Sequence, residues 1–340
     1  MILTRQIIAM HKPTTLVFCF YLALLLAAAG HAQTPAASPG LAYPVKPVRF
    51  VSPFPPGGPT DLLSRPVGAK LMEALGQPVV VDYRSGASGT IGADHVAKAA
   101  PDGYTLLVIT ASFNTAPSAQ KSLPYDTLKD FTGVSPLARG HSLLIVNPGI
   151  PAANLKALVA LAKSQPGKLT YASSGAGGVV HLGMEQFKLA AGINMLHVPY
   201  KGVGPAQQDV IAGFIDMMFI GVTPSIGQIR AGKVRALAVA SPQRSAALPD
   251  VPTIAEMGYP KFEIASNYGI MAPAATPRAV VGRINGALEK ILALPDIKKS
   301  YNAFGVDPWW ETPERFTAWI AEDVARWAAV AKAIHYQPSF

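Results

Sequence analysis

Short apolar runs rich in β-prone residues alternate with helical patterns along most of this chain. Between most of these runs, apolar residues recur at helical spacing, as at Leu62, Leu63, Val67, Leu71 and Leu75. This alternation predicts an α/β protein whose parallel sheets carry helices on both faces. The strand candidates are Val48–Ser52, Val79–Tyr83, Thr105–Ile109, Leu143–Val146, Leu169–Ala172, Met195–Tyr200, Ile215–Phe219 and Arg235–Ala240.

Two further apolar segments, Phe131–Ala138 and Phe262–Ala272, read as strands that cross between domains. A complete α/β set lies between them, and the remaining material lies at the two chain ends. We therefore predict domain 1 from residues 43–138 and 262–340, with domain 2, residues 139–261, inserted into it. A chain of roughly 300 residues is long enough for two cores. Two crossings side by side form a hinge with a cleft beneath it.

The N-terminus predicts a cleaved secretory signal peptide, residues 1–32. Arg5 and Lys12 precede an apolar run from Leu16 to Ala29, and Gly30-His31-Ala32 offers the small residues that a signal peptidase requires. The alternative is an uncleaved membrane anchor, although the run is short for a membrane span. Cys19, the single cysteine, lies inside this run, so the mature protein is expected to have no disulfide. We expect a soluble periplasmic protein.

The formal net charge of the full chain is +9, and loss of Arg5 and Lys12 with the signal peptide lowers it to +7. A basic surface steers anionic ligands toward the protein. The basic residues are spread along the chain without interleaved aromatics, so nucleic-acid binding is not expected. Charged residues make up 14% of the sequence and hydrophobic residues 50%, which is typical of a compact globular protein.

The stretch from Phe50 to Asp61 gives the strongest sign of a ligand site. A short apolar strand enters a turn rich in Pro and Gly, and Thr60 or Asp61 then caps a helix. This layout places free backbone N–H groups at the carboxyl end of a strand, where they bind an anion without a cationic side chain. The ligand-binding residues expected here are Phe54, Pro56, Gly57, Gly58, Thr60 and Asp61.

Three more loops follow strands and precede helices: Arg84–Gly92, Ser173–Gly178 and Lys201–Pro205. Ligands of open α/β sheets bind outside the carboxyl ends of strands. Two of the four loops fall in each expected domain, so a ligand could be held from both walls. Gly-rich turns are also common simply because such turns are tight. The candidates in these loops are Ser88, Ser173, Gly175 and Gly177.

Polar side chains near strand ends complete the candidate site. Ser112, Asn114 and Tyr200 are expected in the cleft. His181 lies just inside the helix after the third loop, where it either packs at a domain wall or hydrogen-bonds a ligand or the loop. His197 is expected to be structural.

Motifs of catalysis, phosphate binding and metal binding are missing. Gly86–Gly92 has glycines at the wrong spacing for a dinucleotide turn, and Thr90 stands where a nucleophile elbow needs glycine. No His-Glu-x-x-His segment or cysteine set offers metal ligands. We expect no enzyme activity and no cofactor.

Together, several segments resemble the extracytoplasmic solute receptors of tripartite tricarboxylate transporters, called Bug receptors. The resemblance covers essentially the whole mature chain. Its segments are Tyr43–Val48, Pro56–Gly58 with Asp61, Leu75–Val81, Lys98–Leu107, Tyr171–Gly175, His181-Leu182, His197–Gly202, Arg235–Val239 and Pro249–Thr253.

The resemblance implies a two-domain periplasmic-binding-protein fold of the Venus flytrap type, similar to type II, with two hinge crossings. It implies that Phe54–Asp61 and Ser173–Gly177 bind a carboxylate through main-chain groups and waters. It also implies delivery to a membrane transporter with a large and a small subunit.

Three segments depart from the family pattern. Pro55 and Pro59 flank the first loop, and Ser88 replaces a glycine in the second. Gly221 stands where an acidic residue would serve an amino group, which disfavours an amino-acid ligand.

We therefore expect a monomeric periplasmic receptor that captures a small carboxylate, which is a di- or tricarboxylate or a related organic acid, by domain closure. Two alternatives stay open. One is a secreted enzyme acting on an anionic substrate, with Ser88 or Ser173 near a base such as His181. The other is a ligand sensor for a membrane kinase.

Overall fold

The structure is a computed structural model that describes residues 43–200, 202–245, 247–260 and 262–338. The described residues from Pro44 onward form one compact unit. The predicted signal peptide, residues 1–32, lies outside the described residues. Among the described residues, no helix has both the length and the apolar character needed to cross a membrane.

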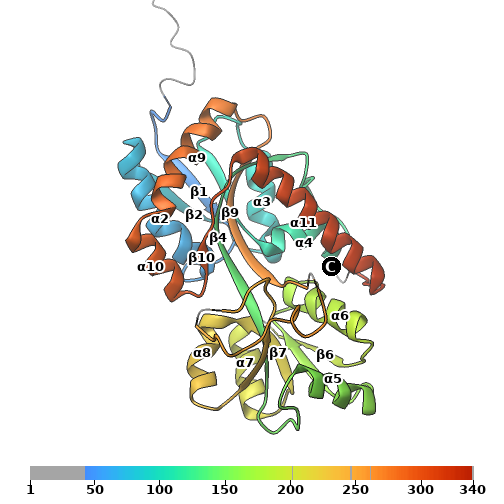
Figure 1. Ribbon diagram of the computed structural model, residues 1–340. Coiled ribbons are helices and arrows are strands. Elements are labelled where there is room, and N and C mark those ends of the chain that lie inside the picture. The colour runs from blue at the N-terminus through green and yellow to red at the C-terminus, as the bar shows by residue number, and fades with distance from the viewer. Residues whose placement is uncertain (1–42, 201, 246, 261, 339–340) are drawn as a thin grey trace, which may run out of the picture. The chain divides into compact units, whose positions relative to one another are not determined.

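The compact unit alternates strands and helices in its first part (Figure 1). In chain order these elements are β1 (Val48–Ser52), α2 (Pro59–Leu75), β2 (Val79–Tyr83), the 3₁₀ turn η1 (Ala87–Gly89), α3 (Thr90–Ala97), β3 (Thr105–Thr110), α4 (Ala111–Ala119) and β4 (Phe131–Val146). The middle of the chain holds α5 (Leu155–Ser164), β5 (Thr170–Ser173), α6 (Val179–Ala191), β6 (Leu196–Pro199), α7 (Val203–Ala212), β7 (Met217–Gly221), α8 (Val222–Arg230) and β8 (Arg235–Val239). The last part holds β9 (Ala265–Pro273), α9 (Arg278–Leu292), α10 (Pro295–Ala303), β10 (Asp307–Pro308) and α11 (Pro313–Ala333).

The strands form a mixed sheet in the order β2-β1-β3-β9-β4-β7-β5-β6, with β8 and β10 pairing with β4. The strands β1, β2 and β3 pair in parallel, as do β5, β6 and β7. All pairings of β4 and β9 are antiparallel. The predicted α/β class is confirmed, but the expectation of purely parallel sheets is wrong at the strands that cross the middle.

The long strand β4 joins two lobes. Its residues Phe131–His141 pair with β9, whereas Ser142–Val146 pair with β7 and β8. The prediction of two separate strands here, Phe131–Ala138 and Leu143–Val146, is wrong, because one strand continues through the residues between them and changes partner at His141 and Ser142. Figure 1 shows β4 and β9 running between the two lobes.

We call the first lobe the part containing β1, β2, β3 and β9, and the second lobe the part containing β5 to β8. The first lobe packs Val51, Leu107, Ile109, Phe113 and Phe131 against α3, α4 and α11. The second lobe has a core on each face of its sheet, one including Phe187 and Phe219 and the other Val210 and Met218. The division into domains at residues 139 and 261 stays a prediction.

The helices begin and end at residues that favour such boundaries. Thr312 caps α11 by accepting a hydrogen bond from the Arg315 amide (3.3 Å), with Pro313 at the first helical position. Gly76, Gly192 and Gly213 end helices in the left-handed conformation. The helix α2 begins at Pro59 with Gly58 as its cap, so the expected cap at Thr60 or Asp61 is wrong. The helix α8 begins at Val222, and α9 takes Pro277 as its cap.

Candidate functional site

A cavity of about 270 Å³ lies between the first and second lobes. Its walls come from residues at the ends of strands in both lobes, from the loops that follow them and from α4 along its length. The first lobe contributes Phe54, Ser88, Thr110, Ser112, Thr115, Ala116, Ala119 and Gln120, and the second contributes Ser174, Gly175, Ala176, Gly177 and Gly178. Two of the four loops predicted from the sequence, Arg84–Gly92 and Ser173–Gly178, contribute to the cavity wall. The first predicted loop lies next to the cavity through Phe54.

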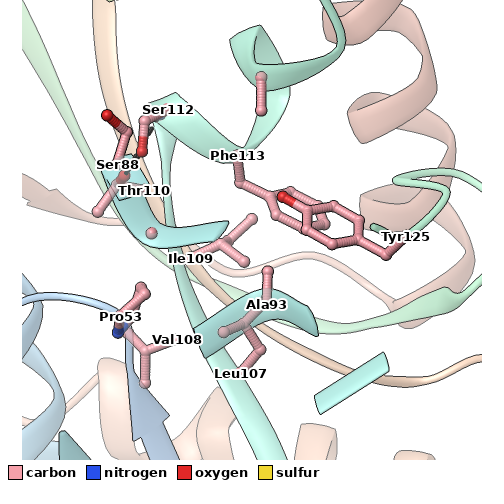
Figure 2. Close-up of a pocket in the computed structure, with 12 residues that line it drawn as sticks. Pro53, Ser88, Ala93, Leu107, Val108, Ile109, Thr110, Ser112, Phe113 and Tyr125 are labelled. Atoms are coloured by element: carbon pink, nitrogen blue, oxygen red, sulfur yellow. Dashed lines mark hydrogen bonds between the residues drawn. The ribbon is translucent and has the colours of Figure 1, made fainter. Parts of the chain in front are cut away.

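Three hydroxyl groups of the first lobe gather at the floor of this cavity. Thr110 ends β3 and caps α4 by accepting a hydrogen bond from the Ser112 amide (3.3 Å), and the two hydroxyls lie 2.7 Å apart. Ser88 lies in η1 beside them, as Figure 2 shows. Below these hydroxyls is a void of about 10 Å³ lined by Leu107, Ile109, Phe113 and Tyr125. A void of that size holds at most one water, so the hydroxyls stand on a closely packed base.

The backbone of η1 is strained. Ala87 and Ser88 have φ values of +46° and +55°, in the left-handed region that non-glycine residues avoid. Such residues cost about 1–3 kcal/mol each and persist where the surroundings fix them, often at ligand sites. This backbone conformation places Ser88 beside Thr110 and Ser112.

The second-lobe wall is the loop from Ser174 to Gly178. Two buried side chains hold its backbone from behind. The Ser173 hydroxyl lies 3.0 Å from the Gly175 oxygen and accepts from the Gly175 amide (3.2 Å). His181 Nδ1 accepts from the Gly177 amide (3.0 Å). The amides of Ala176, Gly178 and Val179 make no hydrogen bond to any described residue, so they remain as donors at the helix end.

The first predicted loop contributes less than expected. Phe54 lines the cavity, whereas Pro56, Gly57, Gly58, Thr60 and Asp61 are not part of its wall. The Gly57 amide donates to the Asp61 carboxylate (2.8 Å), and Thr60 Oγ1 lies 3.0 Å from Ser52 Oγ. The expectation that the Gly57 amide is free for a ligand is wrong, because a carboxylate four residues later already satisfies it.

Asp61 is the anchor of that loop. It is buried and also accepts from Arg65 Nε (2.5 Å) and from the Tyr83 hydroxyl. Burial acts to raise the pKa of the Asp61 carboxyl, but the hydrogen bonds from Gly57, Tyr83 and Arg65 outweigh it and hold that pKa below its ordinary value. Asp61 is therefore ionised at neutral pH.

Other expected residues also lie outside the cavity wall. Asn114 is fully buried and donates from Nδ2 to Asp323 Oδ2 (2.8 Å), because its helix turns it toward α11. The Tyr200 hydroxyl donates to Asp209. Ser173 and His181 lie behind the loop rather than in the wall. Of the residues predicted from sequence, Phe54, Ser88, Ser112, Gly175 and Gly177 line the cavity.

The cavity favours anions without using cations. Among the described residues that line it, none carries a charged side chain. The N-termini of α3, α4 and α6 approach it through Ser88, Thr110 and Gly178. A helix N-terminus stabilises a nearby negative charge by about 0.3–1 kcal/mol, and a hydrogen bond to a charged group contributes about 1.5–3 kcal/mol. Within the described chain, no three His, Cys, Asp or Glu side chains gather as metal ligands would.

Residues 63–336 match the model of the tripartite tricarboxylate transporter family receptor, TctC. The protein BugT of Bordetella pertussis is 38% identical over 292 residues, covering 85% of this chain and 90% of BugT. The chain belongs to the TctC family of receptors. The predicted resemblance to Bug receptors is thereby confirmed.

Solved structures of similar proteins share the fold of this TctC receptor. Rpa4515 of R. palustris, solved with adipate, is 34% identical with a TM-score of 0.77, covering 87% of this chain and 100% of that one. MatC (Rpa3494) of Rhodopseudomonas palustris, solved with bound malate, is 32% identical with a TM-score of 0.71, covering 85% and 100%. The predicted two-domain binding-protein fold is confirmed.

Sequence reasoning found Ser112 of α4 in this TctC receptor but missed the other cavity residues that α4 and the residues flanking it contribute. Thr110, Thr115, Ala116, Ala119 and Gln120 all line the cavity. The sequence did contain a sign of this contribution, because Thr110 follows the apolar strand Thr105–Ile109 in the position of a helix cap. The rule that ligands bind at the carboxyl ends of strands applies there as it does to the glycine-rich loops.

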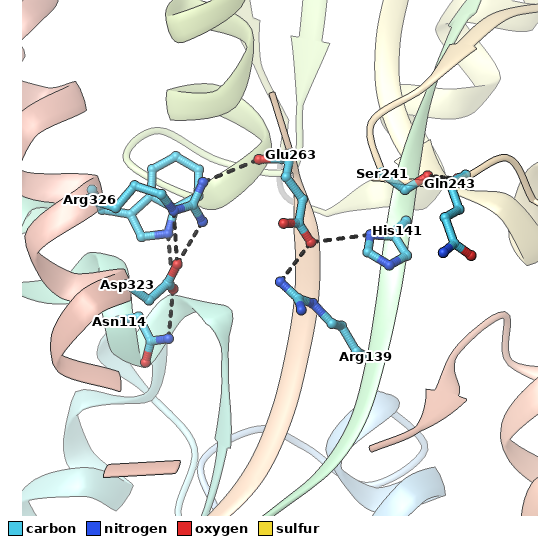
Figure 3. A network of polar contacts seen from close by, with 9 residues as sticks. Asn114, Arg139, His141, Ser241, Gln243, Glu263, Asp323 and Arg326 are labelled. Atoms are coloured by element: carbon cyan, nitrogen blue, oxygen red, sulfur yellow. Dashed lines mark hydrogen bonds and ion pairs between the residues drawn. The ribbon is translucent and has the colours of Figure 1, made fainter. Parts of the chain in front are cut away.

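A polar network ties the two hinge crossings, β4 and the segment leading into β9, together (Figure 3). Glu263, just before β9, lies 2.7 Å from Arg139 Nη2 and 3.5 Å from His141 Nδ1, both on β4. Arg326 of α11 donates to the Glu263 carbonyl oxygen (3.2 Å) and also contacts Asp323. Burial, followed by the nearby Arg139 charge, lowers the pKa of His141 to about 4, so His141 is neutral at pH 7.

The serine–histidine contact of this receptor does not form an accessible nucleophile. Ser173 Oγ lies 2.7 Å from His197 Nε2, and not beside His181 as the enzyme alternative supposed. Ser173 is fully buried, and neither residue lines the cavity. Burial and the neighbouring His181 lower the pKa of His197 to about 4, which makes it a weak base at neutral pH.

Proposed function

We propose that this protein is a periplasmic receptor that captures a small di- or tricarboxylate and delivers it to the membrane subunits of a tripartite tricarboxylate transporter. The observation that carries the proposal is the cavity between the lobes, where hydroxyls and helix N-termini of both lobes converge without a charged side chain. The matched structures with adipate and malate support a carboxylate as the ligand.

The cavity volume of about 270 Å³ suits a small metabolite. It lies just below the range of about 300–1,000 Å³ that is usual for sites of drug-sized ligands. One carboxylate would bind the Ser88, Thr110 and Ser112 hydroxyls in the first lobe. The other would bind the free amides of Ala176, Gly178 and Val179 in the second.

Capture would proceed by closure of the two lobes. A ligand shifts an equilibrium between open and closed states only by its difference in affinity for the two. Because groups of both lobes line this cavity, a dicarboxylate would contact both walls only in the closed state. Three or four charge-assisted hydrogen bonds suffice for micromolar affinity after the costs of association.

Calorimetry with malate and adipate tests the ligand class. The neutral diamide of adipic acid is the matched control, because it has the same chain length without charge. We expect micromolar binding of at least one dicarboxylate and none of the diamide. Equal binding of the diamide, or no heat and no thermal shift with any di- or tricarboxylate, would contradict the proposal.

Two serine variants test whether the ligand binds in this cavity. Ser88→Ala and Ser112→Ala should each weaken binding by about three- to ten-fold, since each removes one hydroxyl from the cavity. Ser164→Ala, on the exposed end of α5, is the control and should bind normally. Unchanged affinity in both cavity variants would place the ligand elsewhere.

Delivery, rather than sensing, is tested separately. If the protein serves a transporter, it should co-purify with the large and small membrane subunits in a ligand-dependent way. Co-purification with a membrane kinase instead would favour the sensor. Mass spectrometry of the mature N-terminus from the periplasm tests the predicted cleavage after Ala32.

A further inference from the structure

Two histidine rings are stacked directly behind the second-lobe loop. The ring centroids of His181 and His197 lie 3.9 Å apart at an interplanar angle of 14°. His197 stacks in turn on Tyr171, with centroids 4.9 Å apart. The three rings come from α6, β6 and β5, so the stack fixes the start of α6 against the sheet.

Each histidine reaches one of the two anchors of the loop. His181 Nδ1 accepts the hydrogen bond of the Gly177 amide (3.0 Å). His197 Nε2 lies 2.7 Å from the Ser173 hydroxyl, which itself contacts both the amide and the carbonyl oxygen of Gly175. Gly175 and Gly177 have φ values of +151° and +74°, so the loop backbone needs these anchors to hold a conformation that other residues avoid.

The hydrogen bond from Gly177 fixes the proton position in His181. Because Nδ1 accepts, neutral His181 carries its proton on Nε2. A second proton could add only at Nδ1, and it would then face the Gly177 N–H donor across 3.0 Å. The loop would have to move away, because two donors cannot share a hydrogen bond.

We propose that His181 is the positioning residue of the anion-binding loop and that carboxylate binding requires its imidazole to be neutral. This inference rests on the proposed function and concerns how the same site is built. The amides of Gly175 and Gly177 are held from behind. The intervening and following amides, those of Ala176, Gly178 and Val179, are thereby left for the ligand.

The surroundings of the pair support a neutral state. His181 faces Tyr171 and His197 from the sheet, Tyr336 from the C-terminal segment, and Glu185 and Lys188 on its own helix. Burial lowers the pKa of His181, and the Glu185 charge, which opposes this effect, is itself paired with Lys188 (2.7 Å). A charge on His197 would further disfavour a charge on His181, because the rings are in contact.

A matched pair of substitutions separates the acceptor from the ring. His181→Phe keeps a stacking ring but loses Nδ1. His181→Asn loses the ring but places an amide oxygen at the position of Nδ1, and it cannot be protonated. At pH 7.5, His181→Phe should weaken malate or adipate binding about ten-fold, which corresponds to about 1.4 kcal/mol, while His181→Asn should restore affinity to within about three-fold of the parent.

The pH dependence supplies the readout that a purely structural role would not change. As pH falls through the pKa of His181, the parent should lose affinity by up to about ten-fold per pH unit relative to His181→Asn. Because the ratio of the two dissociation constants is used, protonation of the ligand cancels. His95→Asn, in α3, is the control and should follow the parent at every pH between 4 and 8.

Hydrogen exchange tests the inference without a ligand. The Gly177 amide should exchange slowly in the parent and in His181→Asn, and at least ten-fold faster in His181→Phe. Equal exchange in the three proteins, equal affinity of His181→Phe and the parent, or a flat affinity ratio across pH would overturn the inference. If exchange follows the expected order but no dicarboxylate binds, the proposed function fails while the positioning role of His181 stands.

Discussion

Gly177 of the second-lobe loop lies against Ala119, the last residue of α4 in the first lobe. A Cβ atom on Gly177 would stand 2.8 Å from the Ala119 Cβ and 2.8 Å from the Tyr336 hydroxyl. This glycine therefore sets how closely the two walls of the cavity approach, in addition to permitting the left-handed turn of the loop.

Gly177→Ala should prevent full closure over the ligand. We expect a loss of at least ten-fold in carboxylate affinity, because the methyl group would stand 2.8 Å from the Ala119 Cβ, a distance that real Cβ atoms do not reach. Calorimetry with malate or adipate measures this loss.

Gly192→Ala is the control for backbone strain. Gly192 ends α6 with a φ of +62°, and no atom lies within 4 Å of the position that a Cβ would occupy there. Both variants should lose about 1–2 kcal/mol of stability through left-handed strain, but Gly192→Ala should bind normally. Similar affinities for the two variants would show that the walls do not meet at Gly177.

Asp61→Asn should destabilise the protein in a pH-dependent way. At pH 7 we expect a loss of about 2 kcal/mol, since the charged hydrogen bonds to Gly57, Arg65 and Tyr83 are weakened. The folded state lowers the Asp61 pKa below its ordinary value of 3.8, so this stability is present above that value and is lost as pH falls through the lowered pKa.

Urea unfolding at pH values from 7 down to 3 checks this prediction. The difference between the parent and Asp61→Asn should shrink at the acid end of the series. Glu73→Gln, on the exposed side of the same helix, should change stability by less than about 0.5 kcal/mol. A pH-independent difference would argue against the anchoring role of the Asp61 charge.

Glu263→Gln should weaken the hinge. The substitution removes the negative charge that lies 2.7 Å from Arg139 Nη2 and so leaves this cation without its counter-charge. We expect a loss of about 1–2 kcal/mol for this partly buried pair. Thermal unfolding measures it, with Glu322→Gln of the exposed pair Arg315–Glu322 as the control that leaves unfolding unchanged. Identical melting of Glu263→Gln and the parent would show that the pair contributes nothing.

Trp327→Ala should be strongly destabilising. Trp327 of α11 is 1% exposed, packs on Leu182 of α6 and donates from Nε1 to Asp323 (3.2 Å). Replacing a buried tryptophan by alanine leaves a cavity in the core and costs about 3–5 kcal/mol of folding stability. Phe214→Ala is the control, because Phe214 is 77% exposed. Denaturant unfolding of both variants provides the measurement, and equal stability would contradict the packing role of α11 between the lobes.

The strands were predictable because their apolar residues form short, separate runs. Val48–Ser52 and Val79–Tyr83 match β1 and β2. The continuity of β4 could not be predicted, because Arg139, Gly140 and His141 interrupt its apolar pattern. Their backbones nonetheless pair with β9, and the side chains of Arg139 and His141 belong to the hinge network.

The candidate site was predicted in part for the same kind of reason. Glycine-rich turns between strands and helices are local features, so Ser88, Gly175 and Gly177 could be found from sequence. The role of Asn114 could not, since its partner Asp323 lies 209 residues away in the chain. The sequence also could not predict that Ser173 pairs with His197 rather than with His181, because this pairing depends on the register of β5 and β6.

The sequence by itself determined the α/β elements, the family and the loops where an anion could bind, because each depends on residues that are close together in the chain. The tertiary structure alone decided which amides remain free for a ligand. Asp61, Ser173 and His181 satisfy the amides of Gly57, Gly175 and Gly177. A hydrogen-bond donor is available to a ligand only when no side chain, near or distant in sequence, has already taken it, and only the folded geometry settles that competition.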